Sequence, residues 1–401
     1  MTSYKWIESR TPDALAADAT ALFNAEFGTA PTGVWAAPGR VNVIGEHVDY
    51  AGGVCIPFAL PLQIAAAVTP REDTKIVAAS QKADGTVARA EVDLKDIRPG
   101  GDIGWLGYVA GTVWAAHESG ALENLTGLNI ALVSDVPLGS GLSSSAALEC
   151  SVAVAAYELD CGHAPDDAAR HQLADAAMRA ENDIVGASTG GLDQTASLFG
   201  AEGKALVIDF DDHTHRLVNF DIADQDLVLL IADTNAPHEL NDGQYASRRG
   251  VIDDVQNALG SLRHLTEEQI ADWARESNKD TQLYAKRTGH VLHETARTLE
   301  AADALDAGDF DTFRRFMADS HASLRDDLEV TTPELDSAAE AAGTLGARMT
   351  GGGFGGAVIA LIAKARVGDT VAAIASAAEE KGFAEPTFYI ATPGDGARRL
   401  V

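Results

Sequence analysis

The chain has 401 residues, of which 46% are hydrophobic and 22% are charged, a composition typical of globular proteins. A single hydrophobic core rarely grows beyond about 250–300 residues, so the length predicts two domains, which we place at 1–215 and 216–401. The formal net charge of −30 excludes nucleic acid and anionic membranes as expected partners, because like charges repel. Solubility alone also favours such a surface charge.

Three further features predict a cytoplasmic protein. The sequence has no run of the roughly 18–20 apolar residues that a membrane span needs, so we expect no membrane partner. Its first residues, MTSYKWIESR, lack the apolar core of a signal peptide. The three cysteines, Cys55, Cys150 and Cys161, are too few and too scattered for a disulfide framework or a zinc site. We expect them to pack as small apolar side chains in a reducing setting.

The first half of the chain alternates segments typical of helices and strands. Leu15, Leu22 and Phe23 are spaced for one face of an amphipathic helix over residues 12–27. The glycine-rich stretch at residues 39–53 predicts a loop. We expect strands at residues 63–69, 75–80, 87–94, 128–133, 204–210 and 227–233, and helices at residues 103–118, 144–159 and 165–183.

The second half contains longer polar, alanine-rich segments, which predict helices. These segments are residues 242–262, 280–307, 310–324, 333–345 and 367–381. Short apolar runs predict strands at residues 347–350, 356–363 and 387–391. Neither an internal repeat nor a low-complexity segment interrupts this pattern.

Residues 137–149, PLGSGLSSSAALE, lie between a predicted strand and a predicted helix. Gly139 and Gly141 can adopt positive φ and let backbone amides approach a ligand, and serines 143–145 open the helix, where serine is a favoured N-cap. The amides and the dipole of a helix N-terminus favour an anion, above all phosphate. The absence of lysine excludes a Walker A loop, and Ser144 breaks the dinucleotide-binding glycine pattern. A plain loop between strand and helix is the alternative interpretation.

A second stretch, GRVNVIGEHVDYAGG at residues 39–53, is dense in hydrogen-bonding side chains. Arg40, Glu46, His47 and Asp49 fall within ten positions. Carboxylates accept hydrogen bonds from hydroxyls, while arginine and histidine donate, so the stretch suits a ligand with many hydroxyls. A solvated polar turn is the alternative.

A third stretch, MTGGGFGGAVIAL at residues 349–361, has five glycines among the six residues 351–356. Such a run lets backbone come very close to a ligand or to another strand, and the residues alone leave both interpretations open.

Together, the three stretches resemble in order and spacing the signature motifs of the GHMP kinases, which include galactokinase, homoserine kinase, mevalonate kinase and phosphomevalonate kinase. The stretch at residues 39–53 is similar to the signature of the galactokinase branch. Residues 190–200, GGLDQTASLFG, resemble the segment that carries the catalytic aspartate of the family, and residues 235–249, NAPHELNDGQYASRR, resemble a segment whose tyrosine touches the sugar. This chain departs from the usual pattern at Val48, Ala51 and Ala357.

The resemblance implies an α+β fold of two domains, an N-terminal ribosomal-protein-S5-like domain and a C-terminal ferredoxin-like α/β sandwich, with the active site in the cleft between them. The implied reaction, a step of galactose catabolism, transfers the γ-phosphoryl group of ATP to the anomeric hydroxyl of α-D-galactose, giving α-D-galactose 1-phosphate and ADP. A kinase for N-acetylgalactosamine, L-arabinose or a uronic acid remains an alternative, as does a non-catalytic galactose and ATP sensor. We expect a monomer.

The resemblance also implies roles for individual residues. Asp193 is expected to act on the anomeric hydroxyl, as a base or as a positioning group, with Arg40 beside it and beside the γ-phosphate. The sugar is assigned to Glu46, His47, Asp49, the backbone of Gly190, and Tyr245. Asp49 is expected to bind the 3- and 4-hydroxyls, and Glu46 and His47 the 6-hydroxyl side. ATP is assigned to Pro137, Leu138, Gly139, Ser140, Gly141, Leu142, Ser143, Ser144, Ser145 and Ala146, and Mg²⁺ to Ser145 and Glu181.

Overall fold

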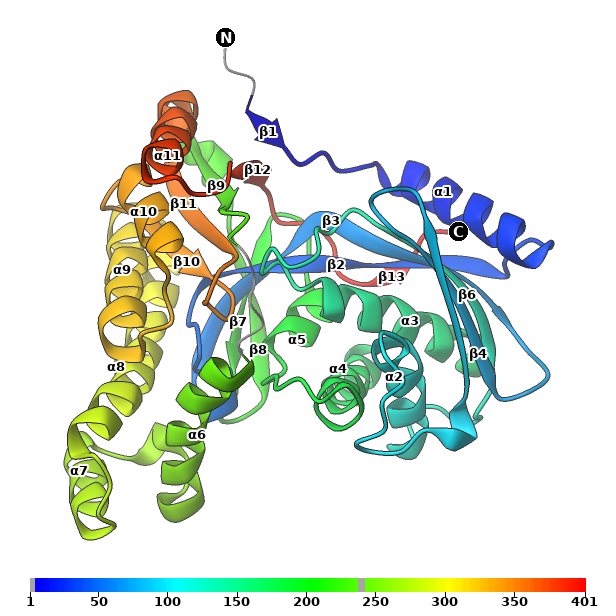
Figure 1. Ribbon diagram of the computed structural model, residues 1–401, viewed down its shortest axis with the longest axis horizontal. Coiled ribbons are helices and arrows are strands. Elements are labelled where there is room, and N and C mark those ends of the chain that lie inside the picture. Colours follow the sequence, from blue (N-terminus) through cyan, green and yellow to red (C-terminus); the bar gives the residue numbers. More distant parts are fainter. Residues whose placement is uncertain (1–3, 237–241) are drawn as a thin grey trace.

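The computed structural model describes residues 4–236 and 242–401, and these form two β-sheets covered by helices (Figure 1). The first half of the chain builds most of an eight-stranded sheet in the order β13-β2-β3-β6-β4-β5, and β3 also pairs with β7, which pairs with β8. Its strands are β2 (Gly33–Ile44), β3 (Val54–Pro70), β4 (Lys75–Gln81), β5 (Val87–Asp93), β6 (Leu128–Ser134), β7 (Lys204–Asp209), β8 (Thr214–Asn219) and β13 (Arg398–Arg399). Neighbouring strands are antiparallel except β4 and β6.

The second half builds a five-stranded sheet in the order β1-β12-β9-β11-β10. Its strands are β1 (Lys5–Trp6), β9 (Leu227–Asp233), β10 (Ala347–Thr350), β11 (Ala357–Ala363) and β12 (Thr387–Ala391). The ends of the chain cross between the sheets, because β1 pairs with β12 while β13 pairs with β2. Each sheet is therefore completed by a segment from the opposite end of the chain.

Helices of the first half pack on both faces of the eight-stranded sheet (Figure 1). They are α1 (Pro12–Phe27), α2 (Leu106–Glu118), α3 (Ser144–Cys161), α4 (Asp167–Arg179) and α5 (Leu192–Phe199). Val34 and Ala36 of β2 pack with α1, whereas Trp35 between them joins the core that contains α2 and α3. This alternation follows from the period of two residues in a strand.

Helices of the second half gather around the five-stranded sheet and extend beyond it (Figure 1). They are α6 (Asp242–Leu259), α7 (Glu267–Glu276), α8 (Thr281–Asp306), α9 (Phe310–Ser323), α10 (Pro333–Ala342) and α11 (Val367–Lys381). Within the described ranges, no helix is both long enough and apolar enough to span a bilayer.

Local signals determine the boundaries of α1, which match the prediction. Thr11 accepts a capping hydrogen bond from the backbone N–H of Ala14, and Pro12 occupies the first turn, where its missing N–H costs nothing. Gly28 ends the helix at a φ of 71°, in the left-handed region that glycine favours.

The predicted loop at residues 39–53 is wrong in its first part. β2 continues to Ile44 with every residue buried, and two register shifts fit its proline and glycine into the sheet. Gly39 is required there because a Cβ would lie 2.5 Å from the carbonyl oxygen of Leu142. Burial of the whole strand therefore overrides the local turn propensity of these residues.

Several other elements differ from the prediction. The predicted strand at residues 63–69 is only the end of the 17-residue β3. The predicted helix at residues 165–183 divides into α4 and a π-helical turn, Ala180–Val185. Besides β2, the elements β1, β8, β13, α5 and α7 were not predicted. β1 and β13 have only two residues each, α5 has only eight, and β8 is mostly exposed.

Candidate active site

A cleft between the two halves of the chain gathers the predicted catalytic and sugar-binding residues together with Glu181, whereas residues 137–146 are not among its lining residues. From the first half it is lined by Arg40, Glu46, His47, Asp49, Glu181, Ser188, Thr189, Gly190, Leu192 and Asp193, and from the second half by Tyr245, Gly351 and Gly352. The space between these residues amounts to about 600 Å³, part of which is open to solvent.

Asp193 lies in the first turn of α5, and both of its carboxylate oxygens have protein partners. Arg40 donates to Oδ1 from Nε at 2.8 Å and from Nη2 at 2.6 Å, and the Ser143 hydroxyl donates to Oδ2. Arg40 also donates from Nη1 to the carbonyl oxygen of Gly141 at 2.6 Å. The arginine therefore joins Asp193 to the glycine–serine loop, although the three segments are far apart in the sequence.

The glycine–serine loop reaches α3 through three residues in the left-handed region. Gly139, Gly141 and Ser143 have φ values of 75°, 74° and 58°. The expected serine N-cap is not formed, because the Ser143 hydroxyl binds Asp193 instead of a helix amide. The first N–H groups of a helix have no intrahelical acceptors, so those of α3 suit an anion at this end of the cleft.

Side chains of the loop differ in what they can offer to a nucleotide. Ser140 donates its hydroxyl to the carbonyl oxygen of Pro137 at 3.0 Å, and Leu142 is part of the core. Leu138 is 85% exposed. The backbone amides and the remaining serine hydroxyls are therefore the groups of this loop that suit phosphate oxygens.

Glu181 is buried beside the N-terminus of α3, in the π-helical turn that follows α4. The Nε2 of Gln194 donates to Glu181 Oε2 at 2.9 Å and to Glu149 Oε2 at 3.0 Å. The Ser145 side chain also hydrogen-bonds Glu181. Turns of the π type often occur at functional sites, and this one turns a helix-end carboxylate inward.

Burial, together with the negative charge of Asp193, raises the pKa of Glu181 to about 7. A divalent cation would reverse that effect and hold the carboxylate ionised. A serine hydroxyl and a carboxylate are hard oxygen ligands that suit Mg²⁺. The described residues contain no cluster of three histidine, cysteine or acidic side chains that would hold a metal alone. An ion at Ser145 and Glu181 would thus take its other ligands from phosphate and water.

Asp49 forms the opposite wall of the cleft, in close contact with Gly190. A Cβ at residue 190 would lie 2.3 Å from Asp49 Oδ2, so only glycine fits there. Burial, reinforced by the nearby charge of Asp193, raises the pKa of Asp49 to about 6. The carboxylate is therefore an acceptor in a site that water reaches poorly.

His47 uses both ring nitrogens within the protein. Burial lowers its pKa to about 3, so the imidazole is neutral at pH 7 and carries one N–H. Its Nε2 lies 3.0 Å from the carbonyl oxygen of Gly352, which can only accept, so Nε2 carries the proton and Nδ1 accepts from the Tyr50 hydroxyl at 3.2 Å. The ring packs against Tyr245, with centroids 5.4 Å apart. The free imidazole donor or acceptor expected for the sugar is therefore absent.

Glu46 is anchored by the glycine-rich stretch of the second half. Its Oε1 accepts from the backbone N–H of Gly351 at 2.7 Å and from the Thr350 hydroxyl at 3.2 Å. This carboxylate joins the stretch at residues 39–53 to the stretch at residues 349–361, which lies about 300 residues away in the sequence.

Three models of known protein families match this chain, and each match contains one of the three stretches described above. The galactokinase galactose-binding signature matches residues 21–70, the GHMP kinases N terminal domain matches residues 107–201, and the GHMP kinases C terminal domain matches residues 301–381. Galactokinase of Streptomyces coelicolor is 40% identical over 97% of this chain and 100% of the relative. The chain belongs to the galactokinase family. Galactokinase of Bos taurus is 38% identical over 96% of this chain and 97% of the relative.

Solved structures extend this relation from galactokinases to other GHMP kinases. The structure of Lactococcus lactis galactokinase complexed with galactose has a TM-score of 0.85 and 32% identity, covering 96% of this chain and 99% of that one. The mevalonate kinase of Methanococcus jannaschii has a TM-score of 0.60 at 16% identity, covering 90% of this chain and 98% of that one, and shares the fold. This galactokinase-family chain therefore has the expected two-domain α+β fold of GHMP kinases.

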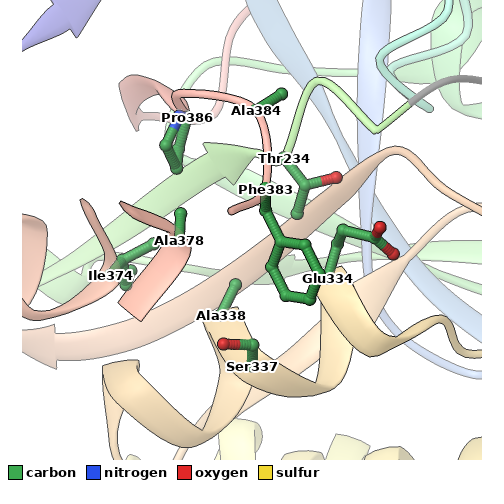
Figure 2. Close-up of a pocket in the computed structure, with 9 residues that line it drawn as sticks. All are labelled: Thr234, Glu334, Ser337, Ala338, Ile374, Ala378, Phe383, Ala384 and Pro386. Carbon is green, nitrogen blue, oxygen red and sulfur yellow. The ribbon is translucent and has the colours of Figure 1, made fainter. Parts of the chain in front are cut away.

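A smaller pocket lies beside α10 and α11 (Figure 2). It encloses about 220 Å³ and is lined by Thr234, Glu334, Ser337, Ala338, Ile374, Ala378, Phe383, Ala384 and Pro386. The Phe383 ring lies at its centre in this view, and none of these described lining residues is cationic. The pocket does not suit a phosphate, and we place the active site in the cleft.

Several residues that line or support the site were not predicted, among them the lining residues Ser188, Thr189, Leu192, Gly351 and Gly352. Gln194 donates to both Glu181 and Glu149, Tyr50 donates to His47, and Arg348 pairs with Glu46. The sequence could have indicated a partner for Arg348, since it is the one charged residue in a short apolar strand and such a charge is rarely buried without a partner. Nothing in the sequence around Tyr50, Glu149 or Gln194 indicated their partners, although Tyr50 lies only three residues from His47.

Proposed function

We propose that this chain transfers the γ-phosphoryl group of ATP to the anomeric hydroxyl of α-D-galactose, releasing α-D-galactose 1-phosphate and ADP. One observation carries the proposal: Asp193, held by Arg40 and Ser143, lies where the N-terminus of α3 meets a pocket lined by hydrogen-bonding groups. The galactose bound to the Lactococcus lactis relative supports the choice of sugar.

Phosphoryl transfer depends mainly on positioning and on stabilisation of charge. The amides at the start of α3 and the loop at residues 137–146 bind the triphosphate. Arg40 is permanently charged and stands in for the absent lysine beside the γ-phosphate. Ser145 and Glu181 hold Mg²⁺, which when bound offsets the negative charge of the phosphates.

Asp193 receives the anomeric hydroxyl at its Oδ2, where the sugar replaces the Ser143 hydroxyl. Ser143 is then free to turn toward the phosphates, while Arg40 keeps Oδ1 fixed. The carboxylate accepts the hydroxyl proton as the new O–P bond forms. A loose transition state needs little activation of the nucleophile, so orientation of the hydroxyl is the larger part of the role of Asp193.

Sugar selectivity rests on acceptors that are fixed before the ligand arrives. Asp49 accepts from the 3- and 4-hydroxyls, Glu46 accepts from the 6-hydroxyl, and the backbone of Gly190 and the Tyr245 ring close the pocket. His47 contributes shape rather than a direct hydrogen bond from its ring. A site of this kind discriminates against analogues that leave its buried polar groups unpaired.

An ADP-release assay over a panel of sugars tests the proposal. We expect turnover with galactose to exceed turnover with glucose, N-acetylgalactosamine, L-arabinose and galacturonic acid. Faster turnover of one of the other sugars would transfer the assignment to that sugar. Calorimetric binding of galactose and ATP without any turnover would identify a sensor instead.

The proposal also includes the domain boundary, the oligomeric state and the cellular location of the enzyme. The predicted boundary at residues 215 and 216 falls within β8, which pairs with β7 along its whole length. We therefore propose that the functional halves divide just after β8, with the cleft between them, and that the chain acts as a cytoplasmic monomer. Its unpaired cysteines, of which Cys55 and Cys150 are buried, support a reducing compartment.

A further inference from the structure

Arg348 is a fully buried charge (0% exposed) on β10, between the apolar residues Ala347 and Met349. Its Nη1 donates to the carbonyl oxygen of Asn42 at 3.3 Å, and its Nη2 lies 3.5 Å from Glu46 Oε1. Arginine stays charged at physiological pH, so burying it is costly unless a negative group lies nearby. The ion pair with Glu46 therefore explains why an arginine is tolerated in this strand.

Glu46 divides its two oxygens between the protein and the cleft. Oε1 accepts from the N–H of Gly351 and forms an ion pair, without a hydrogen bond, with the guanidinium of Arg348. The Thr350 hydroxyl lies 3.2 Å from Oε1, although its shorter hydrogen bond goes to the carbonyl oxygen of Asn42 at 2.9 Å. No donor of the described residues is recorded on Oε2, and Glu46 lines the cleft. One oxygen is thus anchored, and the other remains available to a hydroxyl of the ligand.

The backbone around Glu46 is held from the other side by α8. The N–H of Gly45 donates to Glu294 Oε1 at 3.0 Å, and the Nε2 of His290 donates to the carbonyl oxygen of Glu46 at 3.0 Å. All of these groups are buried. With its backbone fixed by α8, the direction of the Glu46 side chain depends on β10 and on the glycines that follow it.

We propose that Arg348 is a positioning residue for sugar selectivity, which fixes Glu46 through Oε1 so that Oε2 accepts from one hydroxyl of the sugar, the 6-hydroxyl. Arg348 does this without touching the sugar. The inference rests on the proposed function of the cleft and adds a determinant outside its lining. It also explains why an arginine, rather than another apolar strand residue, directly precedes the glycine-rich stretch at residues 349–361.

Arg348→Met removes the charge and keeps much of the apolar stem. We expect the dissociation constant and the KM for galactose to rise by about 10- to 100-fold, as expected for loss of a hydrogen bond to a charged group, with little change in the KM for ATP. We expect 6-deoxygalactose, which has no hydroxyl for Glu46, to lose less than about threefold in affinity. The 2-deoxy, 3-deoxy and 4-deoxy sugars should lose as much as galactose does. Equal losses for galactose and 6-deoxygalactose would overturn the proposal, and so would an unchanged affinity for galactose.

Two further variants separate positioning from general stability. Arg287 is also buried (4% exposed) and pairs with Glu329 at 2.6 Å, away from the lining of the cleft. We expect Arg287→Met to lower the thermal midpoint without changing the ratio of galactose to 6-deoxygalactose affinity. The Thr350 hydroxyl shares its one proton between the carbonyl oxygen of Asn42 at 2.9 Å and Glu46 Oε1 at 3.2 Å. Thr350→Val therefore weakens the anchoring of Oε1 only in part and removes no charge, so it should shift that ratio in the same direction as Arg348→Met by a smaller factor. If Arg348→Met does not fold, Thr350→Val decides, and an unchanged ratio would overturn the proposal.

Calorimetry keeps this test separate from the test of the reaction. If the native chain binds galactose without phosphorylating it, the proposed function fails while the role of Arg348 is still measured by affinity. If galactose is phosphorylated at the native rate but all deoxy sugars respond equally to Arg348→Met, the function stands and the positioning role is rejected.

Discussion

The phosphate end of the cleft and its sugar end are built from different kinds of contact. The phosphate end comes from the first half of the chain and consists of the N-terminus of α3, the permanently charged Arg40, and the carboxylates of Asp193 and Glu181. The sugar end combines residues 45–53 with the glycines that follow β10, and its acceptors are held by a buried layer of donors.

The difference follows from what each ligand requires. A triphosphate is recognised largely by charge, which backbone amides and one guanidinium supply without side-chain packing. A sugar differs from its isomers by the direction of single hydroxyls, so its acceptors must be fixed from behind before it binds. A substitution at one end should therefore impair binding at that end and leave binding at the other end unchanged.

Loss of the Asp193 carboxylate should have the largest effect, because Asp193 lies where the two ends meet. We expect Asp193→Ala to lower kcat by about 10³-fold or more, since it removes the group that orients the anomeric hydroxyl and receives its proton. ATP binding, measured by calorimetry, should persist because the amides of α3 are untouched. A residual rate above about a tenth of the native rate would remove Asp193 from the chemical step.

Gly190→Ala should damage the sugar end alone. The added Cβ would lie 2.3 Å from Asp49 Oδ2 and 2.8 Å from the backbone nitrogen of Tyr50, so the Asp49 carboxylate must move. We expect the KM for galactose to rise by about 100-fold while the KM for ATP changes less than about threefold. The control is Gly368→Ala, where nothing lies within 4 Å of the added atom. Equal losses for both substrates would mean that the two ends are not separable.

Glu181→Gln should damage the phosphate end alone. The substitution keeps the shape of the side chain but removes the charge proposed to hold Mg²⁺, so we expect the Mg²⁺ concentration at half-maximal rate to rise by about 10-fold. Asp183→Asn is the matched control, because Asp183 lies in the same turn and pairs with Arg179 at 3.2 Å on the surface. An unchanged Mg²⁺ titration for Glu181→Gln would refute the ligand assignment.

The smallest expected effect is a pH dependence at the sugar end. Because the pKa of Asp49 is raised from 3.8 to about 6, the folded protein holds this proton more tightly than the unfolded chain does. The free energy of unfolding should therefore fall as the pH rises from 3.8 to about 6, because the unfolded chain loses this proton first. Asp49→Asn should remove this contribution to the pH dependence of the free energy of unfolding.

Galactose binding should show the opposite trend in the same pH range. The ionised Asp49 accepts from two hydroxyls, so affinity for galactose should increase by a few fold between pH 5 and pH 7. Calorimetry at several pH values measures it, with ATP affinity as the comparison. A galactose affinity that does not change between those pH values would remove the ionised Asp49 from sugar binding.

Local signals in the sequence sufficed to predict many elements and to suggest the proposed chemistry of the site. Thr11, Pro12 and Gly28 define α1 whatever surrounds the helix, because capping involves only neighbouring residues. Glycines and serines before α3 indicate an anion site for the same reason, since amides at a helix start always lack partners. Each motif could be interpreted alone, and their joint order indicated the kinase family.

Tertiary structure decided what local propensity could not. Residues 39–44 became a buried strand because packing on both faces outweighs their glycine and their turn propensity. The Ser143 hydroxyl binds Asp193, which lies 50 residues away, and does not cap α3. Both ring nitrogens of His47 are hydrogen-bonded within the protein, to Tyr50 and to Gly352.

The sequence by itself determined which groups are available to bind a phosphate and a polyhydroxylated ligand. Only the tertiary structure decided which of those groups remain free for the ligands, because hydrogen-bonding capacity is shared among neighbours that the chain brings together from distant positions. Glu46 shows this most directly, since its anchors on β10 and α8 are about 250 to 300 residues away, and no pattern within its own motif predicts them.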